Sequence, residues 1–170
     1  MVKKAIALIN ESHHKIPKKL ATNLSASTLQ IAQNRKNLID LIQRQSQAIR
    51  ERLVFEITET TLLRNTAPLL DDLHHIRSLG VMLAIDDFGV GHASLNYLFQ
   101  FRPDFIKLDI KYTQSLHNPD IDALVIFLLN YCKNHQVRLI LEGIESNEQL
   151  HYWSNRGVCD FQGYLFSKLD

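Results

Sequence analysis

The feature that most constrains the fold of this chain is a regular alternation of short apolar runs with segments of helical periodicity. Six runs rich in β-branched and aromatic residues are typical of strands, at residues 19–24, 53–58, 81–86, 105–110, 137–144 and 160–167. Helical spacing of apolar residues occurs before and between them, at residues 2–14, 28–50, 68–80, 94–100, 121–134 and 147–156. Successive strands begin about 20 to 35 residues apart, as strand–helix–strand units require. The sequence therefore predicts an α/β fold with a parallel sheet.

The number of strands leaves two architectures open. Most of the runs are almost continuously apolar, which favours a sheet covered on both faces. A closed barrel needs eight strands and typically about 250 residues, whereas this chain has 170 residues and six predicted strands. The sheet is either open and doubly wound, or a barrel that lacks about a quarter of its wall. In both cases we expect one domain, residues 1–170, with a sizeable core.

Composition excludes several classes of partner. The net charge is +1, so no global field recruits DNA or an anionic membrane. The longest apolar run, residues 123–129, is far shorter than the roughly 20 residues that span a bilayer. We predict no membrane segment and no signal peptide. The two cysteines, Cys132 and Cys159, form no spacing motif, and we interpret them as reduced thiols of a cytoplasmic protein.

Polar side chains recur near the carboxyl end of each predicted strand, where barrels and parallel sheets hold their chemistry. In chain order these residues are Asn23, Glu56 with Glu59, Asp86 and Asp87, Lys107 and Asp109, Glu142 with Glu145, and Gln162. The central pair, Asp86 and Asp87, is followed at once by a turn bracketed by Gly89 and Gly91. Scattered surface charge does not recur at the same point of every unit, so we expect these side chains to form one layer.

Several carboxylates around one point repel one another unless cations neutralise them. Oxygen ligands, from acids and one amide, favour Mg²⁺, Mn²⁺ or Ca²⁺ over zinc. Two metals that share a bridging aspartate would suit a phosphodiester displacement. Lys107 would then orient the attacking water or stabilise phosphate charge; the alternative is a lysine that only pairs with Asp109.

The histidines give weaker signals. His13, His14, His74 and His75 are adjacent pairs on predicted helices, and neighbouring helical residues do not face one another. We interpret both pairs as surface residues, and leave open whether His92, in the central loop, touches a ligand.

Six motifs, in order, resemble the EAL domain family. They are NLS at 23–25, FEITET at 55–60, DDFGVGHASL at 86–95, PDFIKLD at 103–109, LEGIES at 141–146 and QGYLFSK at 162–168. The resemblance covers essentially the whole chain. It implies a modified TIM-like (β/α) barrel that hydrolyses the bacterial second messenger cyclic di-GMP to linear pGpG with Mg²⁺ or Mn²⁺.

The resemblance also implies a role for each site residue. Asn23, Glu56, Asp86 and Asp87 match metal ligands of a two-metal site, with Asp86 as the bridge. Lys107 and Glu142 match residues that handle the catalytic water, and Glu142 is the candidate general base. Glu59 matches a residue that steadies the DDFG loop, and Gln162 matches a position that lines the substrate site.

The sequence departs from the family pattern in ways that change the barrel we expect. No Glu-Ala-Leu triplet occurs, although in the family that strand supplies a metal ligand and precedes NLS. We therefore expect an incomplete barrel with about six of eight strands, open on its N-terminal side. Val90, His92 and Ala93 replace two hydroxyls and a tyrosine of the usual loop. The edges of the first and last strands would be unpaired, so we expect a homodimer, another chain that completes the barrel, or the first helix lying over the opening.

Two functions follow. One is a metal-dependent cyclic di-GMP phosphodiesterase, impaired because a glutamate ligand is missing. The other is a catalytically inactive module that binds cyclic di-GMP or a protein partner in bacterial second-messenger signalling, such as the control of biofilm formation or motility.

Overall fold

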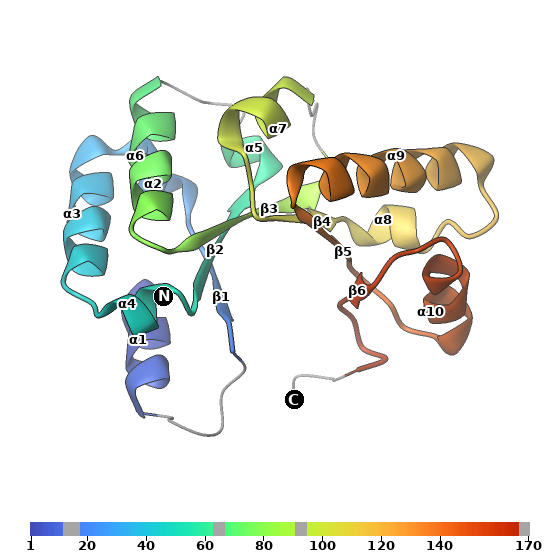
Figure 1. Ribbon diagram of the computed structural model, residues 1–170, viewed down its shortest axis with the longest axis horizontal. Helices are drawn as coiled ribbons and strands as arrows, with labels where there is room; N and C mark the ends of the chain where they lie inside the picture. Colours follow the sequence, from blue (N-terminus) through green and yellow to red (C-terminus); the bar gives the residue numbers. More distant parts are fainter. Residues whose placement is uncertain (12–17, 63–66, 91–94, 167–170) are drawn as a thin grey trace.

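The computed structural model describes residues 1–11, 18–62, 67–90 and 95–166. Within those residues, six strands form one parallel sheet in the order of the chain. The strands are β1 (Leu20–Asn23), β2 (Leu53–Thr58), β3 (Met82–Phe88), β4 (Phe105–Leu108), β5 (Arg138–Leu141) and β6 (Asp160–Phe161). The sheet curves, and the helices lie around its outer side (Figure 1). This is an incomplete TIM-like barrel, open between β1 and β6, and the α/β prediction is confirmed.

The helices follow the predicted alternation, with some additional breaks. They are α1 (Val2–Glu11), α2 (Ala26–Gln30), α3 (Ala32–Gln43), α4 (Gln47–Arg50), α5 (Glu59–Leu62), α6 (Ala67–Ser78), α7 (Leu95–Phe101), α8 (Ile110–Thr113), α9 (Pro119–His135) and α10 (Asn147–Ser154). The prediction of one helix over residues 28–50 was wrong. The backbone is extended at Ile31 and at Ser46, so three helices share that segment. The spacing of apolar residues indicates which face of a segment is buried. Because that spacing continues across a short break, it does not show where one helix ends and the next begins.

Side chains along each strand alternate between the outer and the inner face of the sheet. Phe55 and Ile57 of β2 and Leu83 and Ile85 of β3 belong to the large core between sheet and helices. The alternate positions face the inside of the curve. There Val54, Ala84 and Phe105 form a second, smaller buried cluster. The polar residues at the strand ends stand directly beyond this inner cluster.

The last strand is shorter than predicted. Residues 160–167 were expected to be extended, but β6 ends at Phe161. The chain then turns around the backbone that follows β5, where Ile144 N donates to Gln162 O and Leu165 N donates to Ile144 O. A Cβ on Gly163 would lie 2.2 Å from Ile144 O. That close approach requires glycine and turns the chain away from a strand.

Strands four and five also stop earlier than predicted, at Leu108 and Leu141. The single-turn helices α5 and α8, which follow the ends of β2 and β4, were not predicted. Four residues are too few to show helical periodicity, and α8 begins at a local cap that periodicity does not report. Asp109 accepts a hydrogen bond from Lys111 N and thereby begins α8.

The two edges of the sheet are β1 and β6. The first helix contacts β1 and α4, and its buried residues Ala5, Ile6 and Ile9 join the outer core. The expectation that this helix lies over the opening is therefore wrong. Within the described residues, no helix combines the length and apolar content needed to cross a membrane.

Candidate active site

The parallel register brings the carboxyl ends of the strands to one rim. Asn23 lies opposite Glu56 across β1 and β2, and Thr58 lies opposite Asp86 across β2 and β3. Because side chains alternate along a strand, Glu56 and Asp86 point to the inner face. Lys107 of β4 and Glu142, directly after β5, complete that rim.

Lys107 lies at the centre of the site and is only 5% exposed. Its Nζ is 2.7 Å from Asp86 Oδ1, 2.9 Å from Glu56 Oε1 and 2.9 Å from Glu142 Oε1. Burial by itself lowers the pKa of this lysine. The hydrogen bonds to Asp86 and Glu142 and the charge of Glu56 outweigh burial, so the pKa lies above its usual value. The ammonium is therefore held charged among three carboxylates, from β2, from β3 and from the residue directly after β5.

The alternative interpretation of Lys107, a lysine paired with Asp109, is wrong. The carboxylates that bind its Nζ are Glu56, Asp86 and Glu142. Asp109 stands after the end of β4 and caps α8 through Lys111 N, at 3.0 Å.

A second acidic group overlaps this network. Carboxylate oxygens of Asp86, Asp87 and Glu142 all lie within 4.8 Å of one another. Asp87 is an exposed residue, but partial burial of its carboxyl group, followed by the charges of Asp86 and Asp109, raises the pKa of Asp87. Burial also raises the pKa of Glu142, although Lys107 opposes that shift. Close negative charge of this kind is what a divalent cation relieves, and three hard oxygen ligands fit Mg²⁺, Mn²⁺ or Ca²⁺.

The backbone beside this group is constrained. Asp87 has φ of 53°, in the left-handed region that non-glycine residues rarely adopt. Two residues later, Gly89 N donates to Glu59 Oε2 at 2.7 Å. Glu59 begins α5 and is 3% exposed. A buried carboxylate thus holds the turn that follows the two aspartates.

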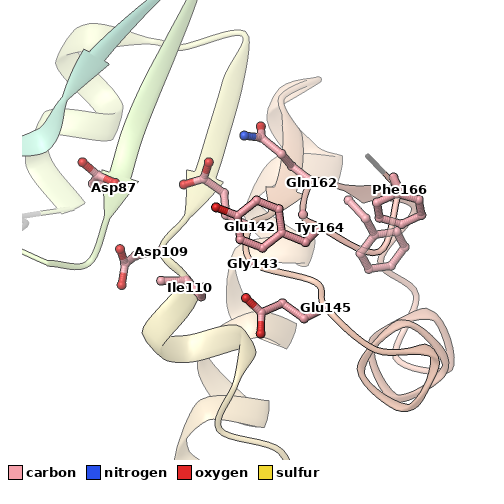
Figure 2. A pocket seen from close by; sticks show the side chains of 11 residues that line it. Asp87, Asp109, Ile110, Glu142, Gly143, Glu145, Gln162, Tyr164 and Phe166 are labelled. Carbon is pink, nitrogen blue, oxygen red and sulfur yellow. The ribbon is translucent and has the colours of Figure 1, made fainter. Parts of the chain in front are cut away.

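A pocket of about 500 Å³ opens beside the acidic group. Figure 2 shows Asp87 and Asp109 on one side of it, and Glu142, Gln162 and Tyr164 on the other. Gln162 lines this pocket from the segment that follows β6. Tyr164 and Phe166, which are 63% and 54% exposed, line the same pocket and were not predicted as site residues. Their exposure beside the pocket is a property of the fold, so the sequence alone carried no signal for these two aromatic residues.

Asn23 and Glu56 are less closely placed. Glu56 reaches the site through Lys107 rather than through the group of three carboxylates. Asn23 stands exposed at the end of β1, opposite Glu56. Both residues lie at strand ends of the same rim as Asp86. A metal site with more ligands than Asp86, Asp87 and Glu142 would therefore include them.

Among the described residues, the predicted pair His74 and His75 lies outside the acidic group of this site. His74 and His75 are exposed on α6, where their ring nitrogens lie 3.1 Å from Gln100 O and 3.2 Å from Gln43 Nε2. That placement agrees with the surface interpretation. His13, His14 and His92 lie outside the described residues.

Comparison with known families gives a match over nearly the whole chain. The profile of the EAL domain matches residues 1–169. The cyclic di-GMP phosphodiesterase RocR of Pseudomonas aeruginosa is 37% identical over 117 residues, which are 68% of this chain and 30% of that protein. The chain spans less than a third of the length of the related proteins it matches first.

Solved structures show the same fold. An EAL domain protein from Listeria monocytogenes superposes with a TM-score of 0.85 at 28% identity, covering 98% of this chain and 65% of that one. BlrP1 of Klebsiella pneumoniae, in a complex with manganese and cyclic di-GMP, superposes with a TM-score of 0.79 at 29% identity, covering 96% of this chain and 41% of that one.

Proposed function

Because the chain belongs to the EAL domain family, we propose that it acts on cyclic di-GMP as a metal-dependent phosphodiesterase that yields linear pGpG. The observation that carries this proposal is the group formed by Asp86, Asp87 and Glu142, two of which contact Lys107, at the rim of a pocket that can receive a ligand. Its donor set is made of hard oxygens beside one cation, which suits the hydrolysis of a phosphodiester.

We propose that Asp86 and Asp87 would hold two divalent metals, with Asn23 and Glu56 as further ligands and Asp86 as the ligand that both metals would share. Bound Mg²⁺ or Mn²⁺ would activate water and neutralise phosphate charge. Glu142 is the general base, and its raised pKa brings it closer to the working pH of a base.

The cation of Lys107 touches both Asp86 and Glu142, and we propose that it orients the water beside the scissile phosphate. Glu59 steadies the turn at Gly89. Gln162, with Tyr164 and Phe166, lines the substrate pocket.

Turnover is expected to be weak. The 170 residues contain no Glu-Ala-Leu triplet, so the ligand that the resemblance assigns to that strand has no counterpart here. Loss of one ligand weakens metal sites and their activity. A module that binds cyclic di-GMP or a protein partner without hydrolysis is therefore the second candidate.

One experiment separates these functions. Purified protein is incubated with cyclic di-GMP and Mn²⁺, pGpG is measured by chromatography, and binding is measured by calorimetry with and without Mn²⁺. Glu142→Gln should abolish pGpG formation, whereas Glu148→Gln, at an exposed site on α10, should not. Binding without turnover would support the inactive module, and equal turnover in wild type and Glu142→Gln would exclude the proposed site.

We further infer that residues 1–170 form a single partial EAL domain whose edges are completed by a second copy or by another chain. Strands β1 and β6 each have one neighbour in the sheet, and such edges favour pairing. We also infer a cytoplasmic location, because both cysteines are free.

A further inference from the structure

The four-residue helix α8 lies between two loops of the site. One loop follows β3, whose last residues include Asp86 and Asp87, and the other follows β5 and begins with Glu142. Side chains of α8 hydrogen-bond to the backbone of both loops. We propose that α8 is the positioning element of this site, which fixes Asp86 and Asp87 relative to Glu142. This inference rests on the proposed metal-dependent function, because it assigns the residues that set the geometry of the metal ligands.

On the β3 side, α8 holds Gly89. Tyr112 Oη and Lys111 Nζ each donate a hydrogen bond to Gly89 O, both at 2.7 Å. The amide of the same residue donates to Glu59 Oε2 from the opposite element, α5. Both polar backbone groups of Gly89 are thereby held by side chains, two residues beyond Asp87.

The Tyr112 ring also fills the space beside this glycine. A Cβ on Gly89 would lie 2.5 Å from Tyr112 Cε2, so the ring and the backbone are in direct contact. Lys111 lies over the same ring, with its Nζ 4.8 Å from the ring centre. Val90 N closes the turn by donating to Asp87 O at 3.2 Å. A shift of Tyr112 would therefore move the turn that places the Asp87 carboxylate.

On the β5 side, α8 holds the backbone of Glu142 itself. Thr113 Oγ1 donates to Glu142 O, and Thr113 is fully buried. Ile110, at the start of α8, packs on the next residue, because a Cβ on Gly143 would lie 2.0 Å from Ile110 Cγ1. Both contacts fix the point from which the Glu142 side chain extends to Lys107 and Asp86.

The helix is itself anchored to the core. Trp153 Nε1 of α10 donates to Thr113 O at 2.9 Å, and Trp153 is fully buried. At the other end, Asp109 N lies 3.4 Å from Phe88 O. A short helix tied at both ends can transmit position between two loops, whereas a free loop could not. The carboxylates of β3 and β5 thus share one rigid spacer.

Variants that remove hydrogen bonds and keep shape test this inference. Lys111→Met with Tyr112→Phe keeps the packing over Gly89 and removes both donors. Thr113→Val keeps the volume of Thr113 and removes its hydroxyl, and Thr113→Ser restores the hydroxyl. Tyr131→Phe, at a half-buried tyrosine on α9, is the matched control.

Two readouts separate positioning from turnover. Hydrogen exchange followed by mass spectrometry reports the amides of Gly89 and Val90, and Mn²⁺ affinity is measured from free Mn²⁺ by electron paramagnetic resonance. The double variant should speed exchange at these two amides and weaken Mn²⁺ binding about 10-fold, with little change in melting temperature. Thr113→Val should also weaken Mn²⁺ binding, and Thr113→Ser should restore it.

The possible results distinguish the positioning role of α8 from the proposed metal function. Unchanged exchange in the double variant would overturn the proposal, and so would faster exchange with unchanged Mn²⁺ affinity. If wild type binds no Mn²⁺, the proposed metal function fails. In that case the exchange experiment still decides whether α8 holds the loop: faster exchange at Gly89 and Val90 than in Tyr131→Phe supports that hold, and equal exchange refutes it.

Discussion

At the scale of single residues, the site depends on how its charges compensate. Lys107 contacts Glu56, Asp86 and Glu142, while Asp87 stands outside that contact and keeps a raised pKa. One buried cation therefore balances only part of the local negative charge. The remaining charge is what a divalent metal would neutralise.

Lys107→Met should destabilise the metal-free protein by about 3 kcal/mol, because breaking a buried ion pair leaves charges without compensation. Mn²⁺ should recover part of this loss, because it neutralises the same carboxylates. Urea denaturation with a chelator, and again with Mn²⁺, measures both effects. Lys36→Met, at an exposed site on α3, is the control. Equal stability of Lys107→Met and wild type without metal would contradict the prediction.

Asp87→Asn should stabilise the metal-free protein at neutral pH, by no more than about 0.5 kcal/mol because this side chain is exposed. Asparagine also tolerates the left-handed backbone.

The sign of the pH dependence follows from the raised pKa of Asp87. Just above the ordinary carboxyl range, the folded wild type binds more protons than the unfolded chain, so its stability falls as pH rises. The gain from Asp87→Asn should therefore be larger at about pH 7 than at about pH 4. Urea denaturation at both pH values, with Asp71→Asn at an exposed site on α6 as control, measures it. The same gain at both pH values would contradict the assignment.

At the scale of elements, the strands bring the acidic residues to one rim, and the short segments after them set their orientation. The turn after β3 combines the left-handed Asp87 with Gly89, whose φ is 93°. Elements α5 and α8 contact that turn from two sides. The geometry of this turn is therefore set by tertiary contacts with α5 and α8 as well as by the residues of the turn itself.

Gly89→Ala should cost about 2 kcal/mol of stability, because alanine at this φ is strained and its Cβ would clash with the Tyr112 ring. Gly157→Ala is a matched control, because its φ of 94° carries the same backbone strain while nothing lies within 4 Å of the added Cβ. That control should cost about 1 kcal/mol. Chemical denaturation gives both values, and an equal loss in the two variants would refute the contact with Tyr112.

At the scale of the whole molecule, the curved sheet leaves its inner side open between β1 and β6 (Figure 1). The backbone hydrogen bonds show which groups face outward on β1. Leu20 N donates to Arg52 O, and Leu24 N donates to Glu56 O, so the amides of Ala21 and Asn23 point away from β2. These outward groups are available for pairing with another chain.

We expect the wild type to associate with itself, and Ala21→Pro to reduce this association. Proline removes an outward amide and leaves the bonds to β2 intact. Ala21→Val keeps the amide and is the control. Sedimentation velocity over rising concentration measures the association. A wild type that remains monomeric, with edge amides protected in hydrogen exchange, would contradict the expected pairing.

The sequence by itself determined the alternation of strands and helices, the parallel sheet and the family. These depend on local patterns, such as the apolar runs at residues 53–58 and 105–110. The first becomes β2 with the same bounds, and the second becomes β4, which ends two residues earlier. The position of an acidic residue at the end of a strand is also a local property. In a parallel sheet the carboxyl ends of the strands lie at one rim, so such a residue is placed at that rim. The amino-acid sequence was therefore sufficient to predict that Asp86, Asp87, Lys107 and Glu142 lie together at one rim.

The tertiary structure alone decided how those residues meet. No spacing in the sequence indicates that Lys107 contacts three carboxylates rather than Asp109, because these partners come from three segments that lie far apart in the chain. The same holds for α8, whose four residues carry no periodicity but contact two loops about 50 residues apart in the chain. Local patterns fix which elements form. Contacts between distant segments fix distances, burial and charge balance, and the proposed chemistry depends on those.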